Sequence, residues 1–130
     1  MTPDILLLED IHASATPILQ GIVGANIVRL RHAPSAAELK SLLPTVQVLG
    51  IRSRTPMTRD VLAMAPELRA IGAYCTGTNN VDLGAASDMG IALFNGPVSN
   101  TRSVAELVLG HTIHLLRRVP ERNTAAHQGV

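Results

Sequence analysis

The sequence has almost no aromatic residues and a single cysteine. Tyr74 and Phe94 are the only aromatic side chains, so a hydrophobic core has to be built from aliphatic residues. These are abundant enough to form one, since 46% of the residues are hydrophobic. Cys75, the one cysteine, cannot form an internal disulfide. We interpret it as a small buried hydrophobe at a strand end, because no residue near it clearly serves as its base.

The sequence also lacks an excess of charge of one sign, and it lacks long apolar runs. A formal net charge of +1 provides no field that would attract nucleic acid. The longest apolar runs are too short to span a bilayer, and the acidic residues within Met1–Asp10 do not fit a secretory signal. We therefore expect a cytoplasmic protein with neither a nucleic-acid nor a membrane partner. Ten of the eleven basic residues are arginines, which suit a small acidic ligand.

Several common sites are excluded by spacing. No two glycines lie two residues apart, so the Gly-x-Gly-x-x-Gly fingerprint of dinucleotide-binding folds is absent, and there is no P-loop. His111 and His114 are three residues apart, but no cysteine or acidic residue nearby completes a metal site. We interpret both histidines as helix-surface or interface residues and predict no metal site.

Five short apolar segments alternate with segments of helical character. The expected strands cover residues 5–8, 26–30, 46–51, 69–74 and 91–95, and the expected helices cover residues 13–21, 35–43, 58–64, 82–89 and 103–119. This alternation predicts an α/β fold, with a flavodoxin-like five-stranded parallel sheet of order 2-1-3-4-5 and helices on both faces. A long C-terminal helix follows the sheet.

Local signals place the ends of these helices. Two Ser-x-x-Glu patterns, at Ser35–Glu38 and Ser103–Glu106, have the form of capping boxes at helix starts. Pro44 is expected to stop the second helix and Pro120 the last. Gly90 is expected to cap the fourth helix.

Ligands of open α/β sheets bind at the carboxyl ends of the strands. That rule selects residues 9–12, 52–55, 75–80 and 95–100. Within 52–55, Arg52, Ser53 and Arg54 offer two guanidinium groups and a hydroxyl. The turn 76–80 has a glycine that lets the backbone approach an anion. Together the two loops could hold a carboxylate, whereas the alternative is a pair of ordinary polar loops, and the residues alone leave both open.

Three sequence blocks resemble a known family. They are Leu49-Gly-Ile-Arg-Ser-Arg-Thr55, Ala70-Ile-Gly-Ala-Tyr-Cys-Thr-Gly-Thr-Asn-Asn-Val-Asp-Leu83 and Phe94-Asn-Gly-Pro-Val-Ser-Asn-Thr-Arg-Ser-Val-Ala-Glu-Leu107. Their order and spacing are similar to the N-terminal region of the D-3-phosphoglycerate dehydrogenases, a branch of the D-2-hydroxyacid dehydrogenase superfamily. The resemblance implies that residues 1–99 are a flavodoxin-like substrate-binding domain. Residues 100–130 would then be an interdomain helix leading to an NAD-binding Rossmann domain that the sequence lacks.

The resemblance also implies roles for individual residues. Arg52, Ser53 and Arg54 would contact or adjoin the carboxylate or phosphate of the substrate, and backbone amides around Thr76, Gly77 and Thr78 would bind the carboxylate. At the interdomain hinge, Asn100 and Thr101 would lie near the nicotinamide end of NAD. The family's catalytic arginine, glutamate and histidine lie downstream of this sequence. No residue here is therefore expected to be catalytic, and the chain alone is expected to be inactive.

The implied function is the substrate-binding part of an NAD-dependent enzyme. It would serve the oxidation of 3-phosphoglycerate to 3-phosphohydroxypyruvate in serine biosynthesis. Two alternatives stay open: a stand-alone anion-binding or regulatory module, and part of another D-2-hydroxyacid dehydrogenase such as glyoxylate reductase. The apolar stripe on the long helix, within Val104–Val119, further predicts a homo-oligomer.

Overall fold

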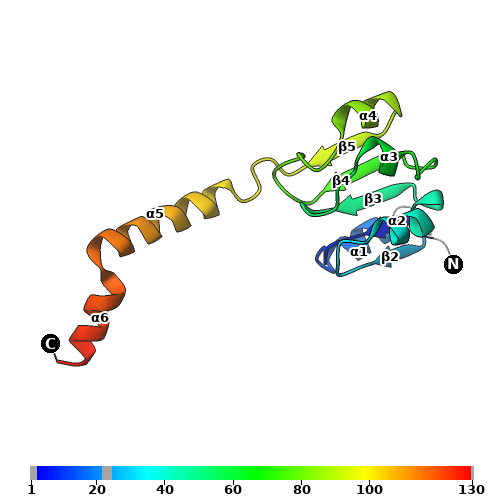
Figure 1. Ribbon diagram of the computed structural model, residues 1–130. Coiled ribbons are helices and arrows are strands. Elements are labelled where there is room, and N and C mark those ends of the chain that lie inside the picture. Colours follow the sequence, from blue (N-terminus) through cyan, green and yellow to red (C-terminus); the bar gives the residue numbers. More distant parts are fainter. Residues whose placement is uncertain (1–2, 22–24, 130) are drawn as a thin grey trace. The chain divides into compact units, whose positions relative to one another are not determined.

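A five-stranded parallel sheet organises the first part of the chain. The computed structural model describes residues 3–21 and 25–129. The strands are β1 (Ile5–Leu7), β2 (Ile27–Arg29), β3 (Val48–Ile51), β4 (Ala70–Ala73) and β5 (Ala92–Asn95). Their order is β2-β1-β3-β4-β5, and every neighbouring pair is parallel (Figure 1). The predicted fold class and strand order are thereby confirmed.

Short helices connect the strands. They are α1 (Ala15–Gln20), α2 (Ala36–Leu42), the 3-10 turn η1 (Leu43–Thr45), α3 (Arg59–Leu62) and α4 (Leu83–Asp88). The capping box predicted for α2 is present, with the side chains of Ser35 and Glu38 each bonded to the other's backbone. The side chains of Thr58 and Asp82 accept backbone N–H groups at the starts of α3 and α4.

The second α-helix ends at Leu42, just before Pro44, as predicted, but the chain then stays helical for one more turn. The chain tightens into η1, with Pro44 inside it near its start. Proline is tolerated in the first turn of a helix, because the amide it lacks would have no intrahelical partner there. The third helix is also shorter than predicted, since α3 ends at Leu62.

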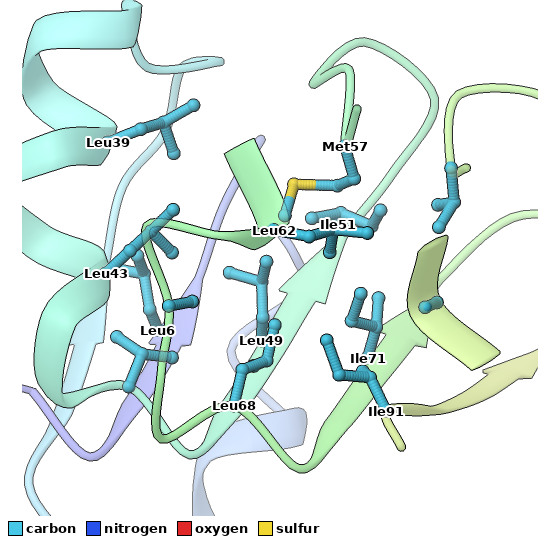
Figure 2. Packing of buried hydrophobic residues seen from close by; sticks show 14 of the residues in the cluster. Leu6, Leu39, Leu43, Leu49, Ile51, Met57, Leu62, Leu68, Ile71 and Ile91 are labelled. Carbon is cyan, nitrogen blue, oxygen red and sulfur yellow. The ribbon is translucent and has the colours of Figure 1, made fainter. Parts of the chain in front are cut away.

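One face of the sheet carries the main hydrophobic core. Leu6, Leu49 and Ile71 lie at the same level of β1, β3 and β4, and all three are fully buried. Figure 2 shows these strand residues facing Leu39, Leu43 and Leu62 of the helical layer. The core is entirely aliphatic apart from Met57 and small residues, as the near absence of aromatic residues requires.

The opposite face also carries a helix, as predicted, but α1 covers it only in part. Side chains of α1 pack there on Ile5, Leu7 and Ile11. The register places Leu7, Gly50, Gly72 and Phe94 in one row across the sheet, and Phe94 at its far end is 66% exposed. A six-residue helix reaches β1 and its neighbours but is too short to cover β5 as well.

A separate unit follows the sheet. The chain divides into Met1–Pro97 and Val98–Val130. The second unit contains α5 (Thr101–Arg117) and α6 (Val119–His127). The prediction of a single helix stopped by Pro120 is wrong: Arg118 adopts a left-handed conformation with φ 51° that ends α5, and Pro120 lies in the first turn of α6.

The second predicted capping box is also wrong. The helix begins at Thr101, so Ser103 lies inside it and cannot cap it. Asn100 is the N-cap residue, and its carbonyl accepts the backbone N–H of Val104 at 3.0 Å. Glu106 is instead bonded to the Arg102 guanidinium at 2.7 Å. Within residues 3–21 and 25–129, no helix is long and apolar enough to cross a membrane.

Candidate functional site

The loops that follow β3 and β4 meet at one edge of the sheet. Parallel neighbouring strands end at the same edge, which brings residues 52–55 beside residues 75–80. A pocket of about 330 Å³ opens between them, lined by Ser53, Cys75, Gly77, Asn79 and Asn80. The structure therefore brings together Ser53 and Gly77 of the predicted substrate-binding set.

Asn80 joins the two loops through its side-chain amide. Its Nδ2 donates hydrogen bonds to the carbonyl oxygens of Arg52 at 3.0 Å and Thr55 at 2.9 Å. The backbone carbonyl of Asn80 accepts the backbone N–H of Met57 at 2.7 Å. The loop after β3 is consequently tied to the loop after β4 at three points.

Glu9, the second residue beyond β1, contacts the loop after β3 from below the surface. Its side chain is 1% exposed, which is rare for a carboxylate. The carboxylate accepts the backbone N–H of Arg54 at 2.9 Å and that of Thr55 at 2.8 Å. The Arg54 guanidinium lies 3.8 Å away, with its side chain 66% exposed. Each oxygen of the buried carboxylate thus has a backbone donor.

These contacts keep Glu9 ionised. Burial by itself acts to raise the pKa of Glu9, but interactions with the Thr55 hydroxyl and with the backbone amides of Arg54, Thr55 and Arg52 together outweigh it. The pKa of this carboxyl therefore lies below its ordinary value. In the part of the chain that the structure describes, the Thr55 hydroxyl has no hydrogen-bond partner. The hydrogen bonds that hold the Glu9 carboxylate are therefore those of the backbone amides of Arg54 and Thr55.

Arg52 borders a second pocket, which shares no lining residue with the first. This pocket, of about 410 Å³, is lined by Asp10, Ile11, His12, Arg52 and Tyr74. The Tyr74 ring forms part of its wall and lies over β3 and β4, where Gly50 and Gly72 leave room for it.

The predicted residues 76–78 form an exposed turn, with Thr78 half-buried. The Cys75 thiol donates to the Gly77 carbonyl at 3.1 Å, and Asn95 Nδ2 donates to the Thr76 carbonyl at 2.7 Å. The interpretation of Cys75 as a buried hydrophobe is corrected to a half-buried residue in the pocket wall, because the turn after β4 leaves one side of it open.

The other predicted residues lie elsewhere. Asn100 and Thr101 are exposed at the start of α5, in the unit Val98–Val130. His111 and His114 are exposed on α5, with ring centroids 6.4 Å apart in an edge-on arrangement. Among the described residues, no group of three or more histidine, cysteine or acidic side chains could hold a metal ion.

Two residues of the site were not singled out from the sequence. The segment containing Glu9 was selected only by its position at a strand end, and the turn 76–80 was selected for its glycine and polar residues rather than for Asn80 itself. One signal for Glu9 was present, since it directly follows the apolar run 5–8 and a charged side chain there has to be either solvated or bonded. For Asn80 the sequence carries no comparable signal.

Comparison with known proteins gives a consistent result. The sequence profile of the family described as D-isomer specific 2-hydroxyacid dehydrogenase, catalytic domain, matches residues 5–127. D-3-phosphoglycerate dehydrogenase of Escherichia coli K12 is 48% identical over 125 residues, which is 96% of this chain and 30% of the relative. The chain therefore spans about a third of the length of the curated relatives it matches.

Solved structures resemble the chain over nearly all of its length. A protein of Thermus thermophilus matches with a TM-score of 0.82 and 26% identity, over 96% of this chain and 40% of that one. The NAD-dependent formate dehydrogenase of Staphylococcus aureus, solved in complex with NAD, matches with a TM-score of 0.72 and 26% identity, over 96% of this chain and 42% of that one.

Proposed function

Because this chain belongs to the family of D-isomer specific 2-hydroxyacid dehydrogenases, we propose that it supplies the substrate-recognition part of a D-3-phosphoglycerate dehydrogenase. The reaction is the oxidation of 3-phosphoglycerate to 3-phosphohydroxypyruvate. The observation that carries the proposal is the pocket where Ser53, beside two arginines, faces the turn containing Gly77. This pairing of donors suits an acidic substrate, and the 48% identity to the E. coli enzyme supports the phosphoglycerate branch.

The residues of the two loops have complementary tasks. Arg52 and Arg54 attract the substrate through its two anionic groups, the carboxylate and the phosphate, and a guanidinium can bind either group with two parallel hydrogen bonds. Ser53 provides a hydroxyl inside the pocket. Backbone amides of residues 76–78 bind the carboxylate, because the glycine allows close approach. The function of this chain is then to bind and orient the substrate.

The residues of this chain do not fit NAD by themselves. When bound, NAD accepts the hydride that leaves C2 of the hydroxy acid. No glycine pair here has the spacing of the dinucleotide fingerprint, and Asn100 and Thr101 are exposed residues at the start of a helix. We propose for these two residues only a position near the nicotinamide end of NAD.

Substrate binding is tested by titrating the ¹⁵N-labelled chain with 3-phosphoglycerate and, in parallel, with glycolate. We expect the amide signals of residues 52–55 and 76–80 to shift with 3-phosphoglycerate at lower concentration than with glycolate. Stronger binding of glycolate would favour the glyoxylate reductase alternative. The absence of shifts with either compound would contradict the proposed function.

Arg52→Ala tests the loop after β3 directly. We expect weaker binding of 3-phosphoglycerate by about 1.5–3 kcal/mol, the value of a charge-assisted hydrogen bond. Arg59→Ala is the matched control, because Arg59 lies on α3 and pairs with Asp88 at the surface at 2.7 Å. Equal Kd values for the two folded variants would count against a role for Arg52.

Catalysis is expected to be absent from the isolated chain, since none of its residues is assigned a catalytic role. Incubation of the chain with NAD and 3-phosphoglycerate should give no NADH absorbance above the rate of a protein-free control. Steady NADH formation in proportion to the amount of this chain would overturn that expectation.

A further inference from the structure

We propose that Glu9 and Asn80 are positioning residues that hold the loop Arg52–Thr55 in the shape that receives the anionic substrate. The inference rests on the proposed function of that loop. Neither residue lies among the expected substrate contacts. Both act through backbone groups of the loop, Glu9 from beneath it and Asn80 from its side.

The Glu9 carboxylate occupies a place that an external anion could otherwise take. Two successive backbone N–H groups, those of Arg54 and Thr55, converge on its two oxygens at 2.9 and 2.8 Å. Successive amides of this kind form an anion-binding nest. Since the nest is already filled by the protein's own carboxylate, these amides are not available to the substrate. Recognition on this loop is left to the side chains of Arg52, Ser53 and Arg54.

The backbone around Glu9 is shaped for this contact. Glu9 and Asp10 both have left-handed conformations, with φ 60° and 55°, which cost energy for residues other than glycine. The amide of Glu9 nevertheless continues the sheet by donating to the carbonyl of His32 at 3.2 Å. Two strained residues in succession persist only where the surrounding contacts determine them, and the buried carboxylate provides such contacts.

Asn80 supports the same loop as a hydrogen-bond donor, whereas Glu9 supports it as an acceptor. Glu9 accepts from the amides of the loop, whereas the Asn80 side chain donates to the loop carbonyls of Arg52 and Thr55. Four backbone groups within four residues are therefore fixed by side chains outside the loop. Because Asn80 also lines the pocket, movement of either loop would be passed to the other.

A purely structural role for Glu9 makes a different prediction. If Glu9 merely stabilised the fold, its substitution would lower the temperature midpoint of unfolding. The Kd of the folded molecules for 3-phosphoglycerate would stay unchanged. A positioning residue changes the Kd in molecules that remain folded. Glu9→Gln separates these roles, since glutamine has the same shape but only one side-chain oxygen, and its NH₂ group would face one of the two loop amides.

The experiment compares three variants of the full chain. Glu9→Gln and Asn80→Ala each remove part of the loop support, and Asn80→Ala keeps the test valid if Glu9→Gln fails to fold. Glu38→Gln is the matched control, because the Glu38 carboxylate also accepts a backbone N–H, that of Ser35 at 2.8 Å, but at the start of α2. Two quantities are measured: the Kd for 3-phosphoglycerate by NMR titration, and the hydrogen-exchange rates of the Arg54 and Thr55 amides.

We expect Glu9→Gln and Asn80→Ala to weaken binding by roughly tenfold or more, in keeping with the loss of a buried hydrogen bond, and Glu38→Gln to bind like the parent. Glu9→Gln should also speed exchange at Arg54 and Thr55. A folded Glu9→Gln or Asn80→Ala chain with the parental Kd would overturn the inference and leave the proposed function intact. If the parent chain binds no 3-phosphoglycerate, the proposed function fails, and the exchange rates of the Arg54 and Thr55 amides then test whether Glu9 supports the loop. Unchanged rates in Glu9→Gln would overturn that support, and faster rates would uphold it.

Discussion

Gly50, in the middle of β3, has no room for a side chain. A Cβ atom there would lie 2.6 Å from Leu7 Cδ2 and 3.0 Å from Ile11 Cδ1. Because Leu7 is 1% exposed, its side chain cannot swing away into solvent. We expect Gly50→Ala to lower the free energy of unfolding by about 1–3 kcal/mol through overpacking, as measured by urea unfolding.

Gly84→Ala is the control for that substitution in the same unit. Gly84 lies in α4, and a Cβ there would meet Asp82 Oδ1 at 3.5 Å, an ordinary contact. An alanine in the helix should raise the free energy of unfolding by about 0.5–1 kcal/mol, since it restricts the unfolded chain. If both alanines change stability in the same direction, crowding is not what requires glycine at position 50.

The role of Glu9 also belongs to the scale of single residues, and the sequence alone could not supply it. The contact joins Glu9 to Arg54 and Thr55, which are 45 and 46 residues away. It depends on β1 lying beside β3 and on a backbone turn with positive φ, and neither is encoded in a local pattern. In contrast, the loop of Arg52–Arg54 was predictable, because its clustered guanidinium groups are a property of consecutive residues.

At the scale of elements, the two Ser-x-x-Glu patterns offer a direct comparison. Ser35→Ala should lower the free energy of unfolding by about 0.5–2 kcal/mol, because the Ser35 side chain caps α2. Ser103→Ala should cause no loss, since Ser103 lies within α5 and alanine is the better helix former. Unfolding followed by far-ultraviolet circular dichroism measures both. Equal losses in the two variants would contradict the assignment of the helix starts.

The same comparison shows why strands and helices were easier to predict than their ends. Every predicted strand is present, because short apolar runs bounded by polar residues leave few other structures. The start of α5 was misplaced since Asn100 competes with Ser103 as a cap, and Arg102 attracts Glu106. The αL residue Arg118, which divides the last helical segment, carries no recognisable signal, because such a conformation is usually marked by glycine.

At the scale of the whole molecule, we propose that two copies of the chain associate through Val104–Val119. No residue of α5 is buried, and Leu107 and Leu115 are 60% and 78% exposed. Each large aliphatic side chain buried in a symmetric dimer would contribute about 1.5–3 kcal/mol before the costs of association. Light scattering over a concentration series should show a dimeric mass.

Leu107→Glu should shift that mass toward the monomer, because it places a charge within the apolar stripe. Arg102→Glu is the control, since it places a glutamate on the same helix but on the side away from Leu107, where the Arg102 side chain is 91% exposed. A chain that is monomeric at high micromolar concentration, whether or not Leu107 is replaced, would rule out the dimer. The apolar side chains of α5 would then have to be buried against other residues of the same copy of the chain.

The position of β1 between β2 and β3 has a consequence for the order in which the molecule is assembled. During synthesis the segment Ile5–Leu7 is made before its partner Val48–Ile51, and the amides that bind Glu9 also follow it by more than forty residues. Until then, a nascent chain presents an apolar strand with an open edge and an unbonded carboxylate beside it. The candidate site therefore cannot form as a local intermediate, and it becomes competent only when the long-range pairing of β1 with β3 is in register.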